Sequence, residues 1–143
     1  MAEPASAVIA LIGTGLKTWS VFEALIKAVK NSPDDIQHWT MVSDLLTKSC
    51  SLMKERLERW RVATLTPTQK DYLESIGEYL RRFQADLSKL EIPDADVFHG
   101  GDSTFKNRAM QAFRLKLDQD DHVIKRVDRN IQIFQISTSG LSL

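Results

Sequence analysis

The chain has 143 residues, and its 19 basic side chains balance its 19 acidic ones. A chain of this length forms one ordinary domain, expected here over residues 1–143, which buries its core without disulfides or metal. Because no basic stripe follows any one face, we expect no nucleic-acid partner. A single cysteine, Cys50, is typical of a reducing compartment, and no secretory signal opens the chain, so we expect a cytoplasmic protein.

Apolar residues recur at helical spacing almost throughout the sequence. This pattern predicts an all-α fold: a single bundle of about five helices, mostly in up-down antiparallel packing. The first helix is expected over about residues 5–30. Ser32 then stands where an N-cap is expected and Pro33 at a first-turn position, so a second, long helix should begin there. Its predicted apolar stripe contains Ile36, Trp39, Leu46, Cys50, Met53, Leu57 and Trp60.

A capping box marks the start of the third predicted helix. Thr66 has the place of the N-cap, Pro67 follows it, and Gln69 stands three residues after the cap. The apolar residues that follow alternate at spacings of three and four, which is typical of a helix packed nearly antiparallel to its neighbours. They are Leu73, Ile76, Leu80, Phe83, Leu87 and Leu90.

The helical pattern fails over residues 91–102, which contain Pro, Gly and Asp and predict an exposed, mobile acidic loop. A fourth helix is expected over about residues 104–117, with Phe105, Ala109, Phe113 and Leu117 facing inward. Three aspartates, at 118, 120 and 121, should end it and cap the fifth helix, which ends near residues 139–140. The predicted inner stripe of the fifth helix is Ile124, Val127, Ile131, Phe134, Thr138 and Leu141.

The residues needed for catalysis are scarce in this sequence. None of the three histidines, His38, His99 and His122, lies at a metal-binding spacing from another ligand, and we expect all three to be structural or solvated. No pairing of nucleophile and base is evident, so we expect neither an enzyme nor a cofactor or metal site. The three tryptophans, Trp19, Trp39 and Trp60, lie on apolar stripes and are expected in the core.

The opening of the chain differs from an ordinary bundle helix because residues 4–16 carry no charge. Its apolar side chains spread round more than one face, which predicts a helix buried on several sides or one that meets lipid or a partner. The residues of this candidate contact site are Ala5, Val8, Ile9, Leu11, Ile12 and Leu16. Gly13-Thr14-Gly15 lacks the rest of a phosphate loop and is interpreted as small-residue packing. A central helix wrapped by the other four remains the alternative to a membrane contact.

Several stretches of the sequence resemble one family. They are MAEPASAVIALIG at residues 1–13, SPDDI at 32–36, AFRLK at 112–116, the segment 124–130 and STSGLSL at 137–143. Together they resemble the fungal N-terminal domain found ahead of NACHT, ankyrin-repeat and related modules in STAND receptors, which belongs with the HeLo and HeLo-like helical bundles. The resemblance covers nearly the whole chain, through patterns of apolar and small residues rather than catalytic signatures.

The resemblance implies an effector domain of a fungal immune-type receptor. In such domains, receptor clustering withdraws an apolar first helix, here residues 5–16, which permeabilises the plasma membrane in programmed cell death or heterokaryon incompatibility. The implied partners are protein partners or further copies of the chain and, on activation, membrane lipid. An adaptor or scaffold bundle that binds another helical domain through an exposed face and never touches lipid is the alternative, favoured by the balanced surface charge and the heptad-like seam of the third and fifth helices.

Overall fold

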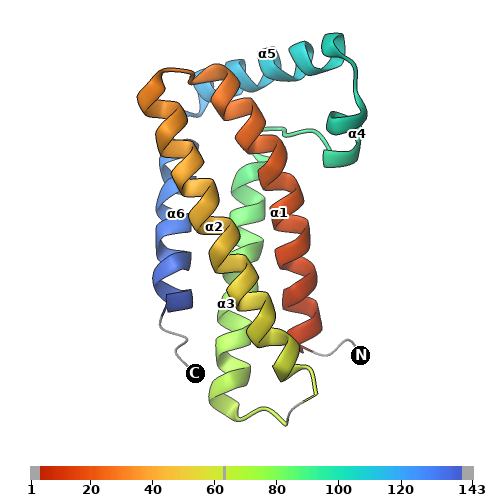
Figure 1. Ribbon diagram of the computed structural model, residues 1–143, viewed down its shortest axis with the longest axis vertical. Coiled ribbons are helices and arrows are strands. Elements are labelled where there is room, and N and C mark those ends of the chain that lie inside the picture. The colour runs from red at the N-terminus through yellow and green to blue at the C-terminus, as the bar shows by residue number, and fades with distance from the viewer. Residues whose placement is uncertain (1–3, 63, 140–143) are drawn as a thin grey trace.

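The computed structural model describes residues 4–62 and 64–139 and, within these ranges, consists of six α-helices (Figure 1). Four long helices run up and down side by side: α1 (Pro4–Val29), α2 (Pro33–Trp60), α3 (Pro67–Ser88) and α6 (Asp121–Ser139). The short α4 (Ala95–Gly100) packs beside α1, and α5 (Ser103–Gln119) lies across one end of the bundle. The all-α bundle is therefore confirmed, with six helices instead of the predicted five.

Two of the predicted helix starts are confirmed by their capping hydrogen bonds. The hydroxyl of Ser32 accepts from the backbone N–H of Asp35 at the start of α2. At the start of α3, the Thr66 hydroxyl accepts from the backbone N–H of Gln69, and the Gln69 side chain accepts from the N–H of Thr66. Each cap satisfies backbone donors that the first helical turn leaves without a partner.

The core is centred on the indole ring of Trp19, in the second half of α1. Its N–H donates to the hydroxyl of Ser43 on α2 at 2.9 Å, a hydrogen bond that is fully buried. The ring lies 4.8 Å from Phe22 and 6.1 Å from Phe83 of α3, measured between ring centres. Trp39 is buried as well, at 6.3 Å from Trp19, so two of the three predicted core tryptophans are confirmed.

The predicted stripes are correct in α3 and partly wrong elsewhere. All six residues predicted for the α3 stripe are buried. In α2, Ile36 is exposed and Trp60 is half-buried against Tyr72, because both lie near helix ends that no neighbouring helix covers fully. In α6 the stripe is shifted by one residue at its start, where Val123 is buried in place of Ile124. The side chains at 137–139 and residues 140–143, and with them Thr138 and Leu141 of the prediction, lie outside the described part of the chain.

Polar side chains hold α6 against its two neighbours. The carboxylate of Asp86 on α3, which is buried, accepts from the Asn130 amide at 3.0 Å and pairs with the Arg126 guanidinium at 3.0 Å. On the other side of α6, Asp128 contacts His38 of α2 at 3.1 Å. A buried carboxylate is stable only when it is paired in this way, so the α3–α6 contact is specific as well as apolar.

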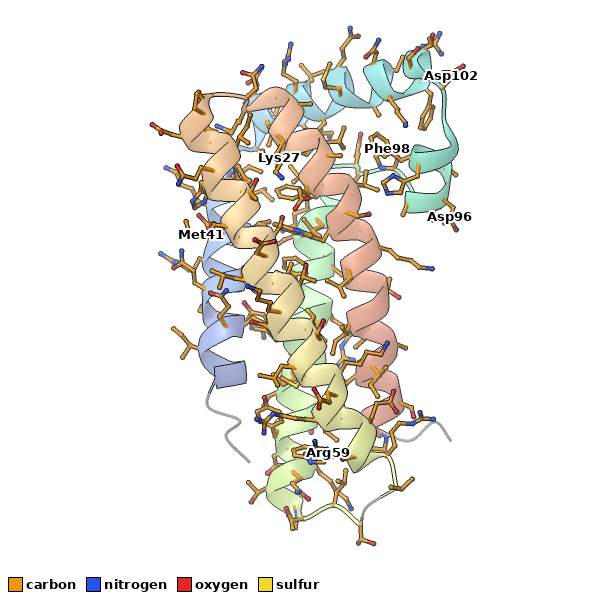
Figure 2. All side chains as sticks on the ribbon, viewed as in Figure 1. Lys27, Met41, Arg59, Asp96, Phe98 and Asp102 are labelled. Atoms are coloured by element: carbon orange, nitrogen blue, oxygen red, sulfur yellow. The ribbon has the colours of Figure 1, made fainter. Side chains whose placement is uncertain are left out.

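The prediction of a loop over residues 91–102 is partly wrong: most of these residues are exposed, as expected, but α4 occupies the middle of the segment. Asp94 caps this helix by accepting from the backbone N–H groups of Asp96 and Val97. Phe98 is only 6% exposed and belongs to the main core. In Figure 2 its ring points from α4 back toward the bundle, while Asp96 points away. Burial of one large aromatic side chain therefore fixes a segment whose composition suggests a loop.

The fourth predicted helix corresponds to α5, which crosses the end of the bundle instead of running up or down within it (Figure 1). Phe113 and Leu117 are buried as predicted, whereas Phe105 and Ala109 are only half-buried. Phe113 packs edge-on against Phe22 of α1, with ring centres 5.9 Å apart. With α5 crossing over, the four long helices alternate in direction, so α1 begins and α6 ends toward the same end of the bundle.

The contact made by Phe98 leads to a first prediction. Phe98→Ala should lower the free energy of unfolding by about 3 kcal/mol, because it removes a large buried aromatic side chain. Val97→Ala, one residue earlier and 56% exposed, should change it by less than about 0.5 kcal/mol. Urea denaturation followed by circular dichroism measures both values. Equal effects of the two substitutions would show that α4 is not anchored through Phe98.

Candidate functional site

The candidate site is the first half of α1, residues 4–16, which we call the opening segment. Of its predicted contact residues, Ala5, Val8 and Ile12 are buried in the core, and Ile9, Leu11 and Leu16 are half-buried against it. The opposite face carries small residues that are exposed: Ala7, Ala10, Gly13 and Thr14. α1 packs against α2, α3, α4 and α5, as expected of a central helix, but one face of the opening segment borders solvent, so these helices do not enclose it on all sides.

The second half of α1 is joined to its neighbours by side-chain hydrogen bonds. The Gln84 amide of α3 donates to the Thr18 hydroxyl at 2.9 Å, and the buried Trp19 indole donates to Ser43 of α2. The Ser20 hydroxyl lies 3.1 Å from the ring nitrogen Nε2 of His99 on α4. These three consecutive residues anchor α1 to three different helices. The core contacts of the opening segment, by contrast, are made by apolar side chains that give little directional preference.

The two glycines in the last turn of the opening segment are not required by packing. A Cβ atom added at Gly13 or at Gly15 would meet nothing within 4 Å. The interpretation of Gly13-Thr14-Gly15 as small-residue packing is therefore wrong, because no neighbouring atom approaches either glycine closely. Both glycines nevertheless lower the intrinsic stability of the helix, by about 1 kcal/mol each relative to alanine. The structure thus places two weak positions in the last turn of the opening segment, next to the anchored half.

A small cavity of about 20 Å³ lies beneath this turn. It is partly open, Ile12, Gly15 and Leu16 of α1 line one side of it, and its walls are largely apolar. The remaining lining residues come from the three other long helices: Leu46, Cys50, Tyr79, Leu80, Phe83, Asn130, Ile131 and Phe134. A void of this kind forfeits dispersion contacts for the atoms around it. The core is consequently underpacked where the opening segment meets the bundle.

Two ionisable side chains face this cavity, and burial keeps both of them neutral. Burial raises the pKa of the Cys50 thiol from its ordinary value of 9.0 to about 12. It also raises the pKa of the Tyr79 hydroxyl from 10.0 to about 12. A thiol with so high a pKa is unreactive at neutral pH, because the thiolate is the nucleophile. Cys50 is therefore a structural residue and a reporter of any opening of α1.

By length and composition α1 is suited to an apolar environment. Among the helices of the described residues it is the one long and apolar enough to cross a membrane, and 33% of its most apolar stretch is buried in the bundle. A core helix of a soluble protein meets the same criteria. Its 26 residues correspond to about 39 Å of helix, against roughly 30 Å for the hydrocarbon core of a bilayer.

The histidines do not form a second site. His38 and His99 each join two helices, through Asp128 and Ser20, and His122 is exposed at the start of α6. Within residues 4–62 and 64–139, no group of three or more His, Cys, Asp or Glu side chains is arranged to hold a metal ion.

Comparisons with protein-family models, with curated proteins and with solved structures give no match to this chain. The resemblance to the fungal HeLo-like domains therefore remains a prediction from the sequence. The opening segment is an uncharged, partly exposed half-helix with apolar core contacts, and it contains two glycines next to the anchored half of α1.

The open space at the two glycines leads to a second prediction. Gly13→Ala and Gly15→Ala should each raise the free energy of unfolding by about 1 kcal/mol, because alanine is the better helix former and meets no atom. Gly101→Ala is the matched control, since its Cβ would come within 2.5 Å of the Phe105 ring and should destabilise. Urea denaturation of the three variants measures these effects. A loss of stability in Gly15→Ala would contradict the open geometry described here.

The raised pKa values lead to a third prediction, on alkaline stability. The folded state holds the Cys50 proton more tightly than the unfolded state, so its contribution to stability is complete below pH 9 and decreases as the pH rises toward 12. Tyr72 and Tyr79, with pKa values raised by burial from 10.0 to about 12, act in the same direction. Thermal unfolding measured across this range should show a falling midpoint, with a shallower fall in Cys50→Ala. An unchanged slope in Cys50→Ala would contradict the assignment to this thiol.

Proposed function

We propose that this chain is an N-terminal effector domain of a fungal immune-type receptor, whose opening segment leaves the bundle on clustering and associates with the plasma membrane. The observation that carries the proposal is the division of α1 into an uncharged half with apolar core contacts and a half anchored by hydrogen bonds. The resemblance to HeLo-like domains supports the same role in programmed cell death or heterokaryon incompatibility.

The energetics explain why the segment stays docked in a single copy. Exposing the buried side chains of Val8 and Ile12 to water costs about 1.5–3 kcal/mol each. Lipid hydrocarbon is as apolar as the core, so this cost is largely recovered when the released segment enters a bilayer or packs against other released segments. The two glycines weaken the helix where the opening segment ends, and Thr18, Trp19 and Ser20 hold the second half of α1 in place.

Clustering favours release because it raises the local concentration of opening segments. Several copies held together present several apolar segments to one patch of membrane, and their combined insertion outweighs the cost of undocking each one. In a lipid-independent adaptor, the uncharged composition of this segment would serve only to pack α1 against the core. Membrane association by the clustered form alone therefore distinguishes the two functions.

Dye release from anionic liposomes tests the proposal with a matched pair of substitutions, which is the fourth prediction. The chain is fused to an inducible oligomeriser, and Ala10→Lys is compared with Ala24→Lys; both alanines are exposed on α1, so neither lysine is buried in the folded bundle. A lysine at the centre of a membrane-inserted helix costs about 2.5–3.5 kcal/mol. Ala10→Lys should therefore abolish release, whereas Ala24→Lys, in the anchored half, should retain it.

Labelling of Cys50 with a thiol reagent provides an independent readout of undocking. Since Ile12, Gly15 and Leu16 line one side of the cavity that Cys50 faces, clustering in the presence of liposomes should accelerate labelling, and Gly15→Ala should slow it again. Circular dichroism shows that each variant is folded. Absence of release and of faster labelling in a folded, clustered wild type would overturn membrane attack and favour the adaptor function.

A further inference from the structure

The outer face of α2 carries an apolar seam that no helix of the bundle covers. Met41, Leu45 and Leu52 are large apolar residues, and each is between 43 and 53% exposed. With Lys48 and Glu55 they follow one another at alternating spacings of four and three residues, which places them on a single stripe of the helix. This is the spacing of a helix that packs along its whole length against another helix. Figure 2 shows Met41 toward one end of α2 and Arg59 toward the other.

Charge is distributed unevenly along the same helix. The first half of α2, residues 33–46, contains three aspartates and no lysine or arginine. The second half, residues 47–60, contains four basic and two acidic side chains. A helix that is acidic in one half and basic in the other is complementary to an antiparallel copy of itself, and like-charged to a parallel copy. The charge pattern thus fits a second copy of this chain in the antiparallel direction and disfavours a parallel one.

We infer that α2 is a self-association surface, on which a second copy of this chain packs its own α2 in the antiparallel direction. The two-fold axis passes through the midpoint of the helix, between Leu46 and Thr47, so that all 28 residues, about 42 Å of helix, lie alongside the second copy. In this register Met41 lies opposite Leu52 of the second copy, and Asp34 lies opposite its Arg59. Lys48 then lies one residue from the level of Asp44.

The exposure of Arg59 in the single copy supports this register. Its guanidinium group is mostly exposed and, among the described residues, pairs with Glu55 of its own helix at 3.7 Å. An exposed pair at this distance contributes little to stability. Asp34 of the second copy therefore supplies a further carboxylate to an accessible guanidinium group.

The seam belongs to α2, whereas the proposed membrane contact belongs to the first half of α1. Only the biological meaning of the pairing, as regulation of an effector, rests on the proposed function. Sedimentation in the absence of lipid and of any oligomeriser measures the pairing directly, and dye release measures the effector activity. A failure of one can therefore be told apart from a failure of the other.

Analytical ultracentrifugation of the full chain over a concentration series tests the seam. Leu52→Glu should raise the dissociation constant of the dimer at least about tenfold, because it places a carboxylate at two symmetry-related apolar contacts. Leu115→Glu is the matched control: this leucine is 61% exposed on α5, outside the seam, and its substitution should leave the dissociation constant unchanged. Circular dichroism confirms that both variants fold. A monomeric wild type, or equal effects of the two substitutions, would overturn the inference.

A charge exchange tests the direction of pairing. Asp34→Arg and Arg59→Asp should each weaken the dimer about tenfold, because each replaces two attractive contacts by repulsive ones. An equimolar mixture of the two variants restores both attractive contacts and should associate nearly as tightly as the wild type. In a parallel pair, where like positions face each other, the wild type, both single variants and the double variant all place like charges together, so neither single substitution would weaken the dimer. Weakening by each single substitution with recovery in the Asp34→Arg, Arg59→Asp double variant therefore supports the antiparallel register. Single variants that associate as tightly as the wild type, or a double variant that does not recover, would overturn it.

Discussion

The buried hydrogen bond from Trp19 to Ser43 is the constraint on which the arrangement of the other helices depends. It fixes the rotation of α1 against α2, and breaking it would leave a buried donor without a partner, at a cost of about 1–3 kcal/mol. The same indole ring packs against Phe83, so the position of α3 follows from it as well. Because this anchor lies in the second half of α1, the opening segment is the part of the helix that the anchor does not hold.

Much of the fold could be predicted from local sequence patterns. Ser32 and Thr66 cap helices through hydrogen bonds to residues only three positions away, so their role can be recognised in the sequence itself. The position of α4 could not be predicted, because Phe98 is buried by residues distant in the sequence, and its short segment has too few apolar residues to show a period. The crossing direction of α5 depends on packing in the same way.

The candidate site could be located from the sequence but not described. The absence of charge over residues 4–16 is a local property, and it identified the opening segment. Which side of that segment faces solvent depends on how α1 is rotated, which the Trp19 contacts determine. The open space at Gly15 could not be predicted from the sequence for a similar reason, because residues of four different helices line the cavity beneath it. A glycine in a helix is equally compatible with tight packing and with a void, and the structure shows the void.

The common direction of the two chain ends has a consequence for assemblies of this domain. α1 begins and α6 ends toward the same end of the bundle. Copies gathered through the end of α6 would therefore all direct the start of α1 toward the same surface. A pair related by the two-fold axis across α2 has the opposite polarity, with its two first helices directed to opposite ends. One membrane surface can meet only one of them. The paired form would therefore be an inactive reserve. The pair must dissociate before copies can assemble with their first helices in one common direction.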